Sequence, residues 1–119
     1  MFPVSTNGII EEKVITLKHA VLVVADEGKP VKVTAENQVA LAADGDLVFG
    51  VLTKVEKDVC AVMIEGVVTL PYTGTAPSLN YSALAANGPT GVKEDINEEI
   101  RYRVLAVDIT NTKVTFILK

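Results

Sequence analysis

The chain of 119 residues is long enough for one domain that buries a hydrophobic core without disulfides. Hydrophobic residues make up 49% of it and charged residues 22%, which excludes a disordered chain. Acidic residues outnumber basic ones by 15 to 11, for a net charge of −4, and no basic patch is present, so we expect no nucleic-acid partner. A single cysteine, Cys60, excludes an internal disulfide.

The first ten residues, MFPVSTNGII, combine apolar side chains with residues that discourage regular structure. They lack the positive charge and long apolar core of a signal peptide, and no apolar run approaches the roughly 20 residues that span a membrane. We therefore expect synthesis in the cytoplasm without a cleaved leader, and no membrane partner. The segment either packs on its own domain or docks on a partner. Its apolar residues are Phe2, Pro3, Val4, Ile9 and Ile10.

β-Branched residues dominate the sequence, because 19 Val, 8 Ile and 11 Thr favour strands. Breaks at Gly, Pro, Asn and Asp predict strands at residues 13–17, 20–25, 31–35, 47–55, 59–64, 67–70, 102–109 and 113–118. Only residues 81–87 and 93–104 have weak helical spacing. Short strands at close spacing predict an all-β fold, a compact small barrel or sandwich with an extended N-terminal arm. We expect residues 1–18 to form the arm and first strand, and residues 19–119 a single β-rich domain.

Two glycines, Gly50 and Gly66, interrupt predicted strands. A glycine inside a strand marks a bulge or a bend, so we expect Gly66 to bend one long strand whose two parts serve different regions of one core. Pro71 is expected to end this ladder, because proline has no N–H to donate.

Two predicted hairpins resemble each other, GVLTKVEKDVCAVMI (50–64) and RVLAVDITNTKVTFI (103–117). Both have a Val-Leu start, a polar turn and an apolar return strand. Either the chain contains a duplication, or the two segments share only the pattern common to all β-hairpins. We favour the second interpretation, because alternation of this kind is degenerate.

The sequence offers few groups suited to catalysis or metal binding. DGD (44–46) lacks the further oxygen ligands of an EF-hand and is predicted to be a turn. The carboxylates of EDINEE (94–99) are predicted to lie in a solvated loop. Cys60 is predicted to be a buried strand residue, since a catalytic thiol would need His19, the only histidine, beside it.

Four segments occur in a fixed order that carries a family resemblance. They are FGVL (49–52), EGVVTLP (65–71), NGPTGV (87–92) and VTFIL (114–118). In this order the chain is similar to the small β-rich capsid decoration proteins of tailed bacteriophages. The resemblance covers roughly residues 20–119. SLNYS (78–82) departs from the Gly-Asp that usually precedes this strand in the family, so that hairpin is expected to differ.

The resemblance implies a non-enzymatic structural protein, without cofactor, catalytic or metal-binding residues. It implies binding to the major capsid protein on the outer surface of the virion, where the protein stabilises the head, as a homo-oligomer that we expect to be a trimer. The residues expected to bind the capsid are Phe2, Pro3, Val4, Ile9 and Ile10. A head-fibre base, a tail-tube module and a small-ligand-binding β-barrel are the alternatives, while an enzyme is disfavoured for want of convergent acid–base groups.

Overall fold

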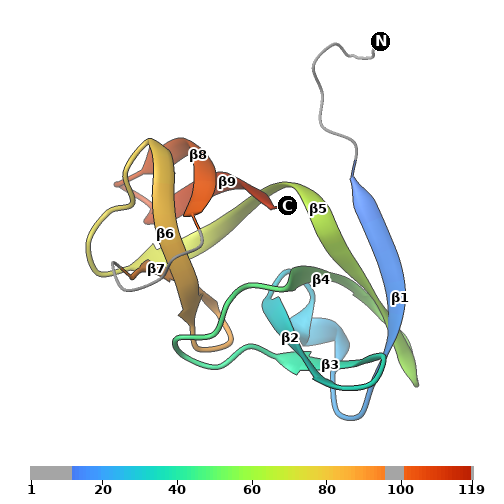
Figure 1. The fold of residues 1–119 in the computed structure, drawn as a ribbon. Helices are drawn as coiled ribbons and strands as arrows, with labels where there is room; N and C mark the ends of the chain where they lie inside the picture. Colours follow the sequence, from blue (N-terminus) through green and yellow to red (C-terminus); the bar gives the residue numbers. More distant parts are fainter. Residues whose placement is uncertain (1–11, 96–100, 119) are drawn as a thin grey trace, which may run out of the picture.

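The computed structural model describes residues 12–95 and 101–118 (Figure 1). These residues form nine strands and one short 3-10 helix, so the prediction of an all-β fold is confirmed. The predicted arm, residues 1–11, lies outside the described residues. The elements are β1 (Lys13–His19), η1 (Val24–Asp26), β2 (Pro30–Ala35), β3 (Gln38–Leu41), β4 (Gly50–Val55), β5 (Val59–Thr73), β6 (Asn80–Asn87), β7 (Gly91–Glu94), β8 (Arg101–Asp108) and β9 (Lys113–Leu118).

The strands close into two rings that share β5. The pairing order β1-β3-β2-β4-β5 is closed by a further pairing of β1 with β5, and we call this barrel the first ring. The order β5-β7-β6-β8-β9 is closed by a pairing of β5 with β9, and we call it the second ring. Figure 1 shows β5 running from one group of strands into the other. Closure leaves few free strand edges, which protects a β protein from edge-to-edge association.

β5 changes partners at Gly66, where φ is +142°. Glu65 pairs with Lys13 of β1, and Gly66, the next residue, pairs with Leu118 of β9. The left-handed backbone at this point is one that glycine adopts without a steric penalty. The predicted bend at Gly66 is thus a change from one barrel wall to another.

The expectation that Pro71 ends the ladder is confirmed for the pairing with β9, although the strand β5 itself continues to Thr73. Pro71 is the last β5 residue paired with β9, opposite Lys113. The parallel pairing with β7 begins at the following residue, Tyr72, whose N–H donates to the Thr112 carbonyl. The missing N–H therefore falls at the end of one ladder, where proline is tolerated.

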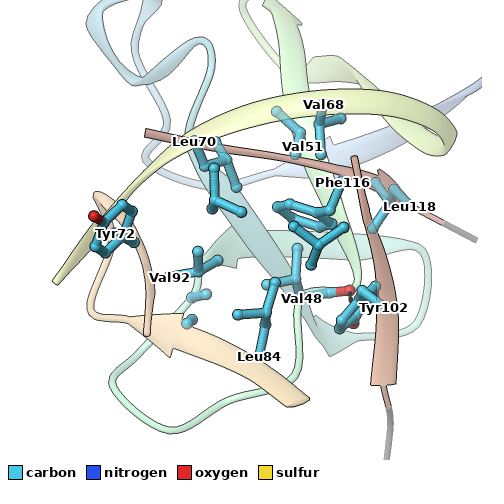
Figure 2. Close-up of a cluster of buried hydrophobic side chains, with 14 residues drawn as sticks. Val48, Val51, Val68, Leu70, Tyr72, Leu84, Val92, Tyr102, Phe116 and Leu118 are labelled. Atoms are coloured by element: carbon cyan, nitrogen blue, oxygen red, sulfur yellow. Dashed lines mark hydrogen bonds between the residues drawn. The ribbon is translucent and has the colours of Figure 1, made fainter. Parts of the chain in front are cut away.

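Each ring has its own hydrophobic cluster, so the two halves of β5 serve two cores and not two regions of one core. The cluster of the first ring contains Leu22, Val31, Val39, Leu52, Val55, Cys60 and Val62. The cluster of the second ring is larger and centres on Phe116, which packs edge-to-face on Tyr102 with ring centroids 5.3 Å apart. Figure 2 shows two side chains of the first-ring half of the chain, Val48 and Val51, within this second cluster.

The loop between β3 and β4, residues 42–49, attaches the first ring to the second. Backbone bonds run in both directions between this loop and Ala86, from Gly45 N–H to Ala86 O at 2.8 Å and from Ala86 N–H to Asp46 O at 2.7 Å. Lys93 forms an ion pair with Asp44 at 3.0 Å, and the Tyr102 hydroxyl donates to Val48 O at 3.3 Å. The loop thereby covers the end of the second ring at which Ala86 lies.

The two rings have the same connectivity. In each ring the first strand pairs parallel with the third strand and antiparallel with the last. The second strand of each ring pairs antiparallel with both the third and the fourth strand. In each ring the fourth strand forms a hairpin with the last. The first ring uses β1 to β4 and the part of β5 before Gly66, and the second uses the rest of β5 with β6 to β9.

The residue registers of the two hairpins, β4 with β5 and β8 with β9, agree with this correspondence. β4 has a bulge after Leu52, which pairs with Val62, and β8 has a bulge after Val104, which pairs with Phe116. The matching bulges indicate a duplication and not merely a general hairpin pattern. They also show that the two Val-Leu pairs, 51–52 and 104–105, do not occupy equivalent positions. Leu52 corresponds to Val104, so the two pairs are displaced by one residue. The same register aligns VITL (14–17) of β1 with VVTL (67–70) of β5.

One predicted strand is wrong, and neither stretch with weak helical spacing forms a helix in its described residues. Residues 20–25 form a loop and η1, not a strand. The stretch 81–87, with weak helical spacing, lies in β6, and the stretch 93–104 supplies parts of β7 and β8. In β6 every residue from Ser82 to Ala86 is buried, so the strand has no polar face and shows no alternation in sequence.

Candidate interaction surface

The residues expected to bind a capsid, Phe2, Pro3, Val4, Ile9 and Ile10, lie outside the described residues, and their role stays a prediction. Glu12, the first described residue, lies against Gly66: its Cγ is 3.1 Å from the position that a Cβ on Gly66 would take. Glu12 therefore lies where β5 passes from one ring to the other.

An open groove of about 200 Å³ lies on the second ring. It is lined by Asn80, Tyr81, Arg103, Val104, Leu105 and Ile117. Tyr81 pairs with Arg103 across β6 and β8, and Arg103 pairs with Ile117 across β8 and β9, so the three side chains form a row across the sheet. Their neighbours Val104 and Phe116 are buried in the core, which places the row on the outer face.

The bulge in β8 explains why a leucine is exposed in this groove. Leu105 is the extra residue between Val104 and Ala106, and an extra residue turns the strand and redirects a side chain. Leu105 is 53% exposed and Tyr81 is 56% exposed. The exposed Arg103 lies between these apolar groups, so the face combines apolar area with a positive charge.

A second apolar feature is the loop that joins β1 to η1, together with Val24, the first residue of η1. Val21, Val23 and Val24 are exposed in it, and only Leu22 is buried. Val21 is the most exposed of them, at 79%. Single exposed valines are ordinary on a protein surface, but three within four positions form an apolar protrusion of the kind that marks contact sites. We call residues 21–24 the valine loop.

Hydrogen bonds from its two central residues hold the valine loop in place. The Val23 N–H donates to Asp26 Oδ2 at 3.1 Å, and Lys29 pairs with the same carboxylate at 3.2 Å. These two groups hold the pKa of Asp26 below its usual value. On the other side, Nδ1 of His19 accepts the Leu22 N–H at 3.2 Å, so Nε2 carries the ring proton and donates to Glu56 O at 2.6 Å.

The predicted burial of Cys60 is confirmed, since the residue is 2% exposed. Burial raises the pKa of its thiol, because desolvation disfavours the thiolate. Neither ring nitrogen of His19 is directed to the sulfur, as both are bonded to the backbone groups described above. The arrangement is the opposite of a nucleophilic site, in which a partner lowers the thiol pKa.

We predict slow modification of Cys60 in the folded protein. Its raised pKa means that thiolate forms only at higher pH than in the unfolded chain, and its burial limits access. A maleimide at neutral pH should therefore label native protein at least about a hundredfold more slowly than urea-unfolded protein, because labelling must wait for opening. Equal rates in the two states would contradict the buried position.

Neither acidic motif forms a metal site among the residues that the structure describes. DGD (44–46) is a turn, as predicted, and its carboxylates form ion pairs, Asp44 with Lys93 and Asp46 with Lys32. Within EDINEE, residues 96–99 lie outside the described residues. No cluster of three or more His, Cys, Asp or Glu suited to a metal ion occurs in residues 12–95 and 101–118. Over the same residues, none of the helices is long and apolar enough to span a membrane.

Sequence reasoning missed the groove and misassigned the valine loop. The only signal for the groove is the alternation of Arg101, Arg103 and Leu105 on one strand, which becomes a surface only when Tyr81 and Ile117 are paired beside it. Comparison with known proteins adds no assignment: no family model, curated protein or solved structure matches the chain.

Proposed function

We propose that this chain is a non-enzymatic structural protein that binds the outer surface of a tailed-phage capsid and stabilises the head. The proposal rests on the order of the four segments that resemble decoration proteins. Its proposed partner is the major capsid protein, and its proposed location is the outside of the virion, where it acts as a homo-oligomer, a trimer.

The observation that best supports a binding role is the valine loop. It presents Val21, Val23 and Val24 to solvent, and hydrogen bonds to Asp26 and His19 hold it in shape. A rigid apolar protrusion loses little conformational entropy when it enters a pocket on a partner, so most of the gain from burial is kept. Burying a valine side chain contributes about 1.5–3 kcal/mol.

A ligand-binding barrel is supported less well by the geometry. Both rings are filled by buried side chains, as in small barrels generally. The groove on the second ring, at about 200 Å³, is below the roughly 300–1,000 Å³ typical of small-molecule sites. A broad, shallow surface of this kind suits a macromolecular partner better.

The test is binding of the purified chain to heads that lack it. The double variant Val21→Ser with Val24→Ser should bind at least tenfold more weakly, because two valines at about 1.5–3 kcal/mol each lose their burial. The matched control is Ile109→Ser, since Ile109 is 71% exposed in the β8–β9 turn but does not belong to the valine loop. Binding is measured by co-sedimentation with heads, and stabilisation by the temperature at which heads release their contents.

Two results would count against the proposal. If the wild-type chain does not co-sediment with heads, capsid decoration is wrong. If the double variant binds as well as the wild type while both remain folded, the valine loop is not the contact, although decoration by another surface would still stand.

A further inference from the structure

The contact between the two rings within the chain is made by two different surfaces. The first ring contributes the outer face of β4 and β5, where Val51 pairs with Met63, together with the loop 42–49. Both Val51 and Met63 pack on the hydrophobic cluster of the second ring. The second ring contributes its end at Ala86, which is completely buried. We call the first surface the β4 face and the second the mouth.

Because the rings are repeats, each has both surfaces, and in each the unused one is exposed. The residues that correspond to Val51 and Met63 are Arg103 and Ile117, by the matching bulges. They lie in the open groove on the second ring. At the mouth of the first ring, Val33 takes the position that Ala86 has in the second ring. Val33 pairs with Val39 of β3, and Ala86 pairs with Val92, the residue of β7 that corresponds to Val39. Val33 is 48% exposed, against 0% for Ala86.

We propose that a second copy of this chain occupies the groove, with its first-ring mouth at Val33 packed on the Tyr81, Arg103, Leu105 and Ile117 face. The contact would repeat between copies the arrangement that already joins the two rings within one copy. A contact between two unlike surfaces leaves one of each free, so it continues head-to-tail and forms a closed ring of copies if the rotation closes.

The composition of the two surfaces fits this occupant. Tyr81, Leu105 and Ile117 supply apolar area opposite Val33, which would otherwise stay in water. Arg103 makes no ion pair within residues 12–95 and 101–118, and the exposed Glu36, which directly follows β2, supplies an opposite charge beside the mouth. In a chain of net charge −4, an arginine within an apolar face favours a partner with carboxylates, as this chain itself has.

Cross-linking between copies that each carry one introduced cysteine tests the geometry directly. One copy has Leu105→Cys and the other Val33→Cys, and the native Cys60 is buried away from reagent. With a short bismaleimide, the mixture should give mainly a heterodimer in which the Leu105→Cys variant is linked to the Val33→Cys variant. This heterodimer should be in at least tenfold excess over a dimer of either variant with itself. An excess of the Leu105→Cys homodimer indicates a face-to-face contact instead and overturns the proposal. Absence of any cross-link at about 1 mM protein also overturns it, since a contact with a Kd of about 1 mM or tighter would be substantially occupied at that concentration.

Charge variants supply an independent readout by sedimentation velocity. Leu105→Glu and Val33→Glu should each remove the concentration-dependent assembly of the wild type, while Ile109→Glu, at a more exposed site in neither surface, should leave it unchanged. Assembly that survives either change overturns the proposal. All three positions are exposed. Each variant is first shown to have the melting temperature of the wild type. If a glutamate variant does not, Leu105→Ser or Val33→Ser replaces it.

The inference does not depend on the phage assignment, because both experiments use the purified chain alone. Head-to-tail association without head binding would leave this proposal standing and remove capsid decoration. Head binding by a chain that shows no cross-link would do the reverse.

Discussion

Replacing Phe116 with alanine is expected to lower the free energy of unfolding by about 3–5 kcal/mol. Phe116 is completely buried and is the largest of the fully buried side chains in the second-ring cluster. Its truncation leaves a cavity that the closed ring cannot collapse to fill, and it removes the edge-to-face contact with Tyr102. A loss of this size is a large share of the stability of a typical domain, so the variant should be partly unfolded at 37 °C.

Urea denaturation followed by far-UV circular dichroism measures the effect. The control is Ile109→Ala, which removes a side chain that is mostly in water and should change stability by less than about 0.5 kcal/mol. Because both rings use β5, we expect one cooperative transition in which the first ring unfolds with the second. Two separate transitions in the Phe116→Ala variant would show that the rings are independent and that the shared strand does not couple them.

The second large effect is expected for Gly91→Ala, which should prevent the second ring from closing. A Cβ on Gly91 would overlap the carbonyl oxygen of Pro71, a backbone atom that cannot move aside without separating β7 from β5. The equivalent position in the first ring holds Gln38, opposite Lys18, so a side chain is accepted there. The difference shows that the strands approach more closely in the parallel pairing of β5 with β7 than in the parallel pairing of β1 with β3.

Thermal melting and expression of soluble protein measure this effect. Gln38→Ala is the matched control, and its melting temperature should stay within a few degrees of the wild type. Gly88→Ala is a second control, since no atom lies within 4 Å of its Cβ position and its cost comes only from a φ of +64°. If Gly91→Ala melts like these two variants, the close approach of β7 to β5 is not required for closure.

Alternation and turn residues were sufficient to predict most of the strands. β1, β2, β4, β5, β8 and β9 all overlap predicted strands, because each has a polar and an apolar face or a long β-branched run. The failures have a common cause in tertiary packing. β6 is made of small residues and is covered on both faces, and the valine loop is β-branched but is held out of the sheet by hydrogen bonds to Asp26 and His19.

The surface residues could not be predicted in the same way. Tyr81, Arg103 and Ile117 are far apart in sequence, and their proximity depends on two pairings and on a bulge that no short pattern specifies. The duplication was visible only as two similar hairpins, because the repeats share topology much more than residues. One of the few stretches with identical residues lies in β1 and β5. There Val14, Thr16 and Leu17 correspond to Val67, Thr69 and Leu70.

The change of partners at Gly66 also bears on how such a chain arises. Glu65 is the last residue of the first ring and Gly66 the first of the second, and they are joined by an ordinary peptide bond inside one strand. All strands of each ring are therefore contiguous in the gene, and fusing two copies of an ancestral half needs no linker. An ancestor of half this length would have presented both the β4 face and the mouth to other copies of itself. Fusion would have made one of those contacts permanent and left the other to evolve on its own.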